Sequence, residues 1–295
     1  MTQWEEHVLT LMDKGRYSEA LVALRALRRQ DIDDFGLRTI LLNEARCLRE
    51  MGEFKQALGR YRELKENHNI SGSDRCLCLL CEAKTLQEMK RFRDARGRLG
   101  ELRRLDSVGE FAVETELVEI NILFDEDKLE QAIKSSESFL TRRREELSGS
   151  EYSGRAYKLE LKIACELVNA GHYKRGLEAI QQLLSRAAKA DLALLYLYMG
   201  VAYEDTGESG RAIASYKGVL SNTENADLLA RAHYHLGAHY YKNGATAWAK
   251  QHLLEAERIG LPLDISPREL YKFLAAACAH VGEFEEYQKY ARLAK

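Results

Sequence analysis

Proline is almost missing from this sequence, with two residues in a chain of 295. Valine and threonine are also few, whereas leucine, alanine, glutamate, lysine and arginine are abundant. These are the residues that favour helices over strands. Hydrophobic residues make up 45% of the chain and charged residues 31%, which is typical of a folded protein rather than a disordered one. We therefore expect an all-α protein.

Several other features are lacking. No uninterrupted apolar run approaches the roughly 20 residues of a membrane span. The first seven residues have neither the basic start nor the apolar core of a signal peptide. Six cysteines in so long a chain do not indicate a disulfide framework, and we expect them to be reduced and mostly buried. The sequence therefore predicts a cytoplasmic protein without membrane contact.

Strong charge of one sign is absent as well. The formal net charge is −2, and neither half of the chain is an electrostatic arm. General attraction to nucleic acid or to anionic lipid is not indicated by this balance. We expect neither nucleic acid nor a cofactor as a partner.

A turn residue recurs along the whole chain at a nearly constant interval. With Gly207 as the template, the pattern is found at Gly15, Gly52, Lys90, Asp127, Gly171, Gly207, Gly244 and Gly282. The spacings are 37, 38, 37, 44, 36, 37 and 38 residues. A steady period in this range is typical of a solenoid of stacked supersecondary units. The pattern predicts about eight helix–turn–helix repeats.

The residue types around each turn agree with this register. Four residues before the turn the side chain is usually large, as at Leu48 and Tyr203. Five residues after it the residue is small in seven repeats: Ala20, Ala57, Ala95, Ala132, Gly176, Ala212 and Ala249. Small residues are expected where the axes of two paired helices approach closely. Gly200 and Ala212 have this role in the central repeat, with tyrosines beside them.

One repeat carries a recognisable motif: Gly200, Tyr203, Gly207, Ala212 and Tyr216. In this spacing the chain resembles the tetratricopeptide repeat family, and the resemblance covers essentially the whole sequence. It implies a right-handed α-solenoid whose first helices line a concave groove. Here the interval is longer than the usual one, the proline after each second helix is missing, and Lys90 and Asp127 replace two turn glycines.

These observations predict a single tetratricopeptide-like solenoid over residues 1–295. The expected repeats lie near 2–31, 36–69, 73–105, 109–147, 151–188, 190–222, 225–260 and 266–295. The interval of 44 residues marks an irregular junction at 141–155, where a cluster of serine and glycine predicts a helix that ends in a flexible loop. No polar capping helix follows the last repeat, so a homo-oligomer formed through the C-terminal end is possible.

Residues ten, six and three positions before each turn share one face of the first helix and are the candidates for the groove. They include Leu42, Arg46, Arg49, Leu80, Lys84, Leu117, Asn121, Phe124, Leu161, Leu197, Val201, Tyr234 and Tyr241. One interpretation is an apolar groove for an extended peptide or amphipathic helix, with a basic corner at Arg46, Arg49 and Lys84 for an acidic group. The alternative is that neighbouring first helices bury these leucines. The carboxylate clamp that binds chaperone tails in this family needs Lys and Asn where this chain has leucines.

Three other patterns suggest chemistry. The basic run 90–104 could bind nucleic acid, but a solvated helix face is the favoured interpretation. Cys76, Cys78 and Cys81 cannot converge on one metal ion from a single helix, and we expect them to be buried. His235 and His239 are one helical turn apart and could share a metal, although no third ligand is identifiable. We expect no bound metal.

No phosphate-binding loop or nucleophile elbow is found. The sequence therefore predicts a non-enzymatic scaffold or adaptor that binds a partner peptide or helix in its groove. The alternative is a regulatory sensor whose superhelix pitch responds to a peptide or small ligand about the junction 141–155. A metal-binding protein or an enzyme that uses His235 and His239 is the least favoured hypothesis.

Overall fold

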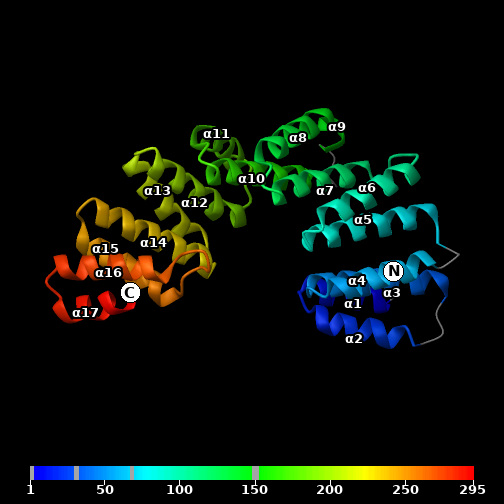
Figure 1. Ribbon diagram of the computed structural model, residues 1–295, viewed down its shortest axis with the longest axis horizontal. Helices are drawn as coiled ribbons and strands as arrows, with labels where there is room; N and C mark the ends of the chain where they lie inside the picture. The colour runs from blue at the N-terminus through cyan, green and yellow to red at the C-terminus, as the bar shows by residue number, and fades with distance from the viewer. Residues whose placement is uncertain (1–2, 30–32, 67–69, 148–152) are drawn as a thin grey trace. The chain divides into compact units, whose positions relative to one another are not determined.

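The structure is a computed structural model, and it describes residues 3–29, 33–66, 70–147 and 153–295. Every regular element in these ranges is an α-helix (Figure 1). The chain divides into two compact units, Met1–Thr141 and Arg142–Lys295. The Ser/Gly cluster of the predicted junction lies mostly outside the described residues. Continuity of one solenoid over 1–295 stays a prediction.

The first unit consists of four consecutive helical hairpins. Its helices are α1 (Gln3–Asp13), α2 (Tyr17–Leu27), α3 (Asp34–Glu50), α4 (Phe54–Glu66), α5 (Gly72–Glu88), α6 (Phe92–Leu105), α7 (Ala112–Asp125) and α8 (Leu129–Arg142). Each helix from α2 to α6 packs against the next helix along the chain. The elements are therefore stacked in sequence order, as expected of a repeat array.

The second unit begins with a single helical turn and continues with four hairpins. Its helices are α9 (Arg144–Leu147), α10 (Ser153–Asn169), α11 (Tyr173–Leu184), α12 (Lys189–Asp205), α13 (Ser209–Asn222), α14 (Ala226–Lys242), α15 (Thr246–Ile259), α16 (Pro267–His280) and α17 (Phe284–Leu293). The first helices α10, α12, α14 and α16 also pack against one another in that order. They form the surface on which the candidate site lies.

All eight predicted turn residues have positive φ, including the two that are not glycine. At Lys90 and Asp127 φ is 57° and 58°. The Lys90 amide donates to Gln87, and the Arg91 amide donates to Leu86, at 2.8 Å each. The same pair of backbone bonds recurs at every turn and satisfies carbonyls at the end of the first helix. The turn is thus specified by backbone geometry, so it survives at Lys90 and Asp127 with some steric cost.

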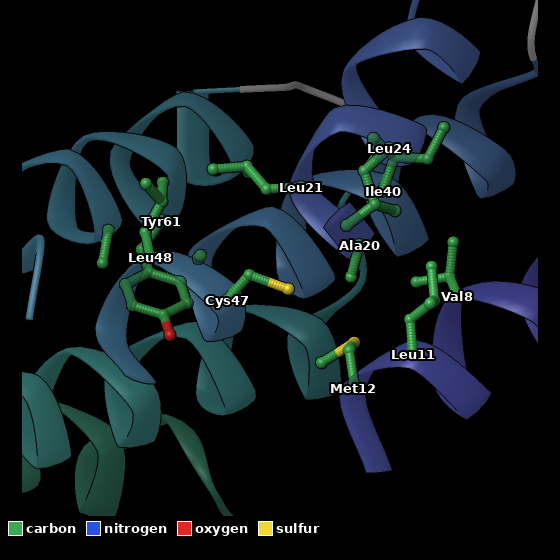
Figure 2. Packing of buried hydrophobic residues seen from close by; sticks show 12 residues of the cluster. Val8, Leu11, Met12, Ala20, Leu21, Leu24, Ile40, Cys47, Leu48 and Tyr61 are labelled. Atoms are coloured by element: carbon green, nitrogen blue, oxygen red, sulfur yellow. The ribbon is translucent and has the colours of Figure 1, made fainter. Parts of the chain in front are cut away.

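The core of each unit is a spine formed by the inner faces of the hairpins. In the first two repeats, Val8, Leu11, Ala20, Leu24 and Ile40 are almost fully buried together (Figure 2). The alanines five residues after the turns are 0% exposed in all six repeats that have one. These alanines let the paired helices approach closely, which confirms the register derived from the sequence.

Glycine replaces alanine or a larger residue where the approach is closest. A Cβ atom on Gly200 would lie 2.4 Å from the ring of Tyr216, and one on Gly237 would lie 2.6 Å from Leu253. Both contacts are far below van der Waals distance, and both neighbours are 0% exposed. Glycine at 200 is therefore required by packing against Tyr216, as the sequence indicated.

Glutamates at one repeat position link neighbouring repeats of the first unit. Glu44 and Glu82 stand eight residues before their turns and are 0% and 5% exposed. The ion pairs are Arg60–Glu44 at 2.6 Å, Arg28–Glu44 at 3.5 Å, Lys65–Glu82 at 2.7 Å, Arg98–Glu82 at 3.3 Å and Arg103–Glu119 at 2.5 Å. Each glutamate pairs with a basic side chain from the preceding repeat, and Glu44 and Glu82 also pair with one from their own repeat. We call the three glutamates and their basic partners the acid ladder.

In the second unit the position of the acid ladder is apolar, as at Ile163 and Leu236. Repeats there are joined by apolar packing between neighbouring hairpins. Among the described helices, none is both long and apolar enough to cross a membrane.

Candidate functional site

The candidate site is a pocket of about 400 Å³ on the first helices of the second unit. Its lining is Asn169, Leu194, Leu197, Tyr198, Val201, Asp227, Leu228, Arg231, His235 and Asp264. Helices α12 and α14 supply most of these residues, the end of α10 supplies Asn169, and the segment before α16 supplies Asp264. Two of them, Leu197 and Val201, are groove residues predicted from the sequence.

One wall of the pocket is apolar. Leu197 is 7% exposed and packs into the core beneath α12, while Leu194, Val201 and Leu228 are half-buried. Tyr198 adds a half-buried ring, and burial raises the pKa of its phenol. This wall offers apolar contacts to a ligand without being a closed part of the core.

Arg231 is the polar centre of the pocket. Its Nη1 and Nη2 donate to both carboxylate oxygens of Asp264 at 2.7 Å, and its Nε donates to Asp227 at 2.8 Å. The bidentate bond to Asp264 is the largest cause of the raised pKa of Arg231, followed by the opposing effect of burial. The guanidinium is therefore a permanent cation in the lining of the pocket, oriented by two carboxylates that are themselves mainly exposed.

A second polar group lies beside the pocket, centred on Glu204. The Tyr216 hydroxyl donates to Glu204 at 3.0 Å, and the Lys242 ammonium donates at 2.9 Å. His235 Nδ1 lies 3.6 Å from the same carboxylate and its ring stacks on Tyr216. Burial opposes ionisation, but His235 and Lys242 outweigh it and lower the pKa of Glu204 to about 2. This network fixes the ring of His235 where it forms part of the pocket.

Further along the first helices, the predicted groove residues Tyr234 and Tyr241 belong to an aromatic cluster. Both rings make edge contacts with Phe273 on α16, at centroid separations of 6.3 and 5.7 Å. The Tyr241 ring also meets His280 at 6.0 Å. Tyr234 and Tyr241 are half-buried, so their rings are accessible on one side. On α10, the predicted Leu161 is half-buried as well.

The apolar candidates of the first unit are less open. Leu80 is 3% exposed and Phe124 is 9% exposed, so both belong to the core. Leu42, Leu117 and Asn121 are half-buried. Burial between neighbouring first helices therefore accounts for part of the predicted apolar series.

The predicted basic corner differs from the expectation in one respect. Arg49 is not free: it pairs with Glu50 at 2.6 Å and with Glu88 at 3.4 Å. Lys84 is half-buried, and Arg46 is exposed. Because two carboxylates from adjacent repeats already neutralise Arg49, only part of the expected cationic surface faces solvent.

The cysteines and histidines are arranged differently from a metal site. Cys76 and Cys78 are 3% and 0% exposed, whereas Cys81 is only half-buried. Burial raises the pKa of the Cys78 thiol to about 12. His239 is 4% exposed and faces the core, whereas His235 faces the pocket, so the two do not converge. The structure instead pairs His233 with His252, whose Nδ1 atoms are 2.9 Å apart. Within the described ranges, no group of three potential ligands could hold a metal ion.

Sequence reasoning did not find the Arg231–Asp264 pair or the acid ladder. Arg231 stands thirteen residues before its turn, outside the positions considered for the groove. The ladder did leave a signal, since glutamate stands eight residues before the turn in three successive repeats and in none of the next four.

Comparison with solved structures identifies the fold. RapI in its apo form has a TM-score of 0.70 at 13% identity, covering 99% of this chain and 95% of that one. The apo quorum sensor NprR from B. thuringiensis has a TM-score of 0.62 at 15% identity, covering 99% and 96%. A tetratricopeptide repeat protein from Parabacteroides merdae has a TM-score of 0.55 at 18% identity, covering 93% and 97%.

The chain therefore has a tetratricopeptide-like helical solenoid fold, and the fold class predicted from the repeat pattern is confirmed. No protein-family model matches the sequence, and no curated protein matches it at a significant level. The identities are too low for anything beyond the fold to follow from these likenesses.

Proposed function

We propose that this chain is a non-enzymatic interaction protein that binds a peptide or helix of a partner protein on the first helices of its second unit. The main support for this proposal is the pocket lined by α12 and α14, which combines the apolar side chains of Leu194 and Val201 with Arg231. An apolar wall with one oriented cation suits a segment that has an apolar anchor and a carboxylate. Amphipathic helices that lay an apolar face into a groove are one known class of such ligands.

The surroundings support a ligand longer than one residue. Asn169 provides an amide at one end of the pocket, and Tyr234 and Tyr241 provide half-buried rings farther along the first helices. A peptide lying along these helices would meet polar, apolar and aromatic groups in succession. Aromatic side chains with one accessible face are frequent in such interfaces.

The carboxylates around Arg231 do not prevent binding of an acidic group. Asp264 is 64% exposed and Asp227 is 52% exposed in their side chains. Because both carboxylates are mainly exposed, either one can return to solvent when a ligand carboxylate takes its place at Arg231. We therefore infer a preference for peptides with an acidic residue or a free C-terminus at this position.

The test uses one pocket variant and one matched control. A random-peptide display library is selected on immobilised protein, and the selected peptides are labelled for fluorescence anisotropy. Leu194→Asp places a charge in the apolar wall and is expected to weaken binding by about tenfold or more. Leu192→Asp alters the same helix at a half-buried leucine outside the pocket, and is expected to retain binding.

If the two variants bind the selected peptides equally well, or if no peptide is selected at all, the proposal is refuted. Thermal unfolding of both variants separates loss of the pocket from loss of the fold.

One contact favours a second candidate function, that of a sensor. Asp264 lies in the segment between α15 and α16, and its bond to Arg231 ties that segment to α14. A ligand carboxylate that takes Arg231 would release this tie and alter the last two repeats. Faster hydrogen exchange at residues 260–266 in the presence of a selected peptide would support the sensor. Unchanged exchange would leave a simple binding module.

The expected cytoplasmic location belongs to the same proposal and is consistent with six free cysteines. Self-association through the last repeat is also retained as a proposal. Phe284 and Leu293 on α17 are 72% and 49% exposed and would lie in such a contact. Analytical ultracentrifugation of the wild type beside Phe284→Ser would test it.

A further inference from the structure

A second pocket lies in the first unit, among α4, α5 and α6, and has a volume of about 470 Å³. It is built mainly from the second helices of two neighbouring hairpins, and α5 contributes Glu82 and Leu86. It is therefore separate from the groove candidates, which all lie on first helices. Leu58 of α4 and Leu86 provide its apolar contacts.

The lining of this pocket is strongly basic. Five of its ten residues are arginine or lysine and two are carboxylates. Glu82 is 5% exposed and binds Lys65 at 2.7 Å and Arg98 at 3.3 Å, as part of the acid ladder. Arg98 also pairs with Glu101 at 2.9 Å, so Lys65 and Arg98 both have carboxylate partners within the protein.

Two of the remaining three basic residues of the lining have no carboxylate partner of this kind among the described residues. The third, Arg91, pairs with Asp94 at 2.6 Å. Arg62 and Arg93 are exposed, and neither has a carboxylate partner within the part of the chain that the structure describes. Two unpaired guanidinium groups thus flank a concave surface with leucines inside it. Arginine binds carboxylates in bidentate fashion and is the residue favoured for such recognition.

We propose that this pocket binds an acidic segment of a protein partner, with an apolar side chain on Leu58 and Leu86 and carboxylates on Arg62 and Arg93. The assignment rests on the excess of basic over acidic side chains in the lining, which suits an acidic ligand, and on the apolar contacts of Leu58 and Leu86. Nucleic acid is less well suited, because no aromatic residue lines the pocket for base stacking and the chain as a whole carries a formal charge of −2. The site is independent of the pocket in the second unit.

Gly97 allows the pocket to be filled without disturbing the fold. It lies on α6, lines the pocket, and a Cβ atom built on it would meet no atom within 4 Å. Leucine at this position would extend into the pocket and is also a better helix former than glycine. Gly100 on the same helix has equally free space around its Cβ position but does not line the pocket, so Gly100→Leu is a matched control.

The experiment selects a random-peptide display library on the full-length wild type and measures the enriched peptides, labelled with fluorescein, by anisotropy. The wild type is expected to enrich peptides that combine Asp or Glu with Leu or Phe. Gly97→Leu should weaken their binding by about tenfold or more, whereas Gly100→Leu should leave it within about twofold. The double variant Arg62→Glu, Arg93→Glu should also weaken binding and reduce its dependence on salt.

Thermal unfolding must show that Gly97→Leu is at least as stable as the wild type. Absence of enriched acidic peptides, or equal binding by Gly97→Leu and Gly100→Leu, overturns the proposal. Binding of labelled oligothymidylate that is lost in Gly97→Leu, without selection of acidic peptides, also overturns it and assigns the pocket to nucleic acid. Acidic peptides whose binding depends on Leu194 alone overturn it while upholding the function proposed for the second unit.

Discussion

Replacement of Gly200 by alanine is the sharpest test of how the second unit is packed. The added Cβ would lie 2.4, 2.6 and 2.8 Å from three atoms of the Tyr216 ring. That ring is 0% exposed, stacks on His235 and is anchored by the bond from its hydroxyl to Glu204. The ring therefore has little freedom to withdraw, and the contact must be relieved by separation of α12 and α13.

Two opposing terms set the size of the effect. Alanine in place of glycine in a helix stabilises by about 0.5–1 kcal/mol. Forcing an additional methyl group into a well-packed core costs about 1–3 kcal/mol. We expect a net loss of about 1–2 kcal/mol for Gly200→Ala, because the close contacts are with a fully buried ring. In a unit of this size this corresponds to a fall in Tm of about 2–8 °C.

The assay is thermal and urea unfolding beside Gly210→Ala, a control on the exposed side of α13. A Cβ on Gly210 would meet no atom within 4 Å, so only the higher helix propensity of alanine acts there. The free energy of unfolding of the control should therefore rise by up to about 1 kcal/mol. Opposite signs for the two variants are therefore expected. If Gly200→Ala stabilises the protein as much as the control does, the ring of Tyr216 yields freely and the packing argument is refuted.

Three further outcomes follow from the structure. Glu44→Gln should destabilise the first unit by roughly 1–3 kcal/mol in urea unfolding because it breaks buried ion pairs, whereas Glu63→Gln, with a side chain 38% exposed, should change little. Lys90→Gly should raise stability by about 0.5–1 kcal/mol because φ at this turn is +57°; equal or lower stability would contradict this. Burial, aided by His233, lowers the pKa of His252 to about 4. The unfolded chain, with a pKa near 6.5, then binds the proton first, so stability should fall as the pH falls from about 6.5 to 4. A flatter pH profile in His252→Phe would support this, and an unchanged one would refute it.

The fold could be predicted because the same residue types recur at the same positions of successive repeats. The turn at Gly207, the small residue at Ala212 and the large residue at Tyr203 recur with one period, and helical pairs then follow from sterics alone. Lys90 and Asp127 were found only through this period, since lysine rarely adopts positive φ and aspartate does so much less often than glycine. The structure has the turn at both positions.

The site could be predicted only in part, because neighbouring repeats decide which groove residues are open. Val201 lines the pocket and is half-buried, whereas Leu80 and Phe124 are 3% and 9% exposed and belong to the core. Arg231 was missed because its partner Asp264 lies outside any helix, in a segment whose path the repeat period does not determine. Long-range pairs of this kind depend on how repeats stack, which a single sequence does not specify.

The acid ladder has a consequence for building new arrays from this chain. Residues 53–90 contain α4 and α5. They carry two basic residues of the acid ladder, Arg60 and Lys65, on α4 and the glutamate Glu82 on α5. A tandem copy of this segment would present Arg60 and Lys65 where Arg98 and Arg103 now stand, so charges of the correct sign would meet at each new joint. The first unit can thus be lengthened by copies of this segment. In the second unit ion pairs between repeats, such as Lys242–Glu204 and Arg231–Asp264, do not recur at one repeat position, so each new joint would need its own design.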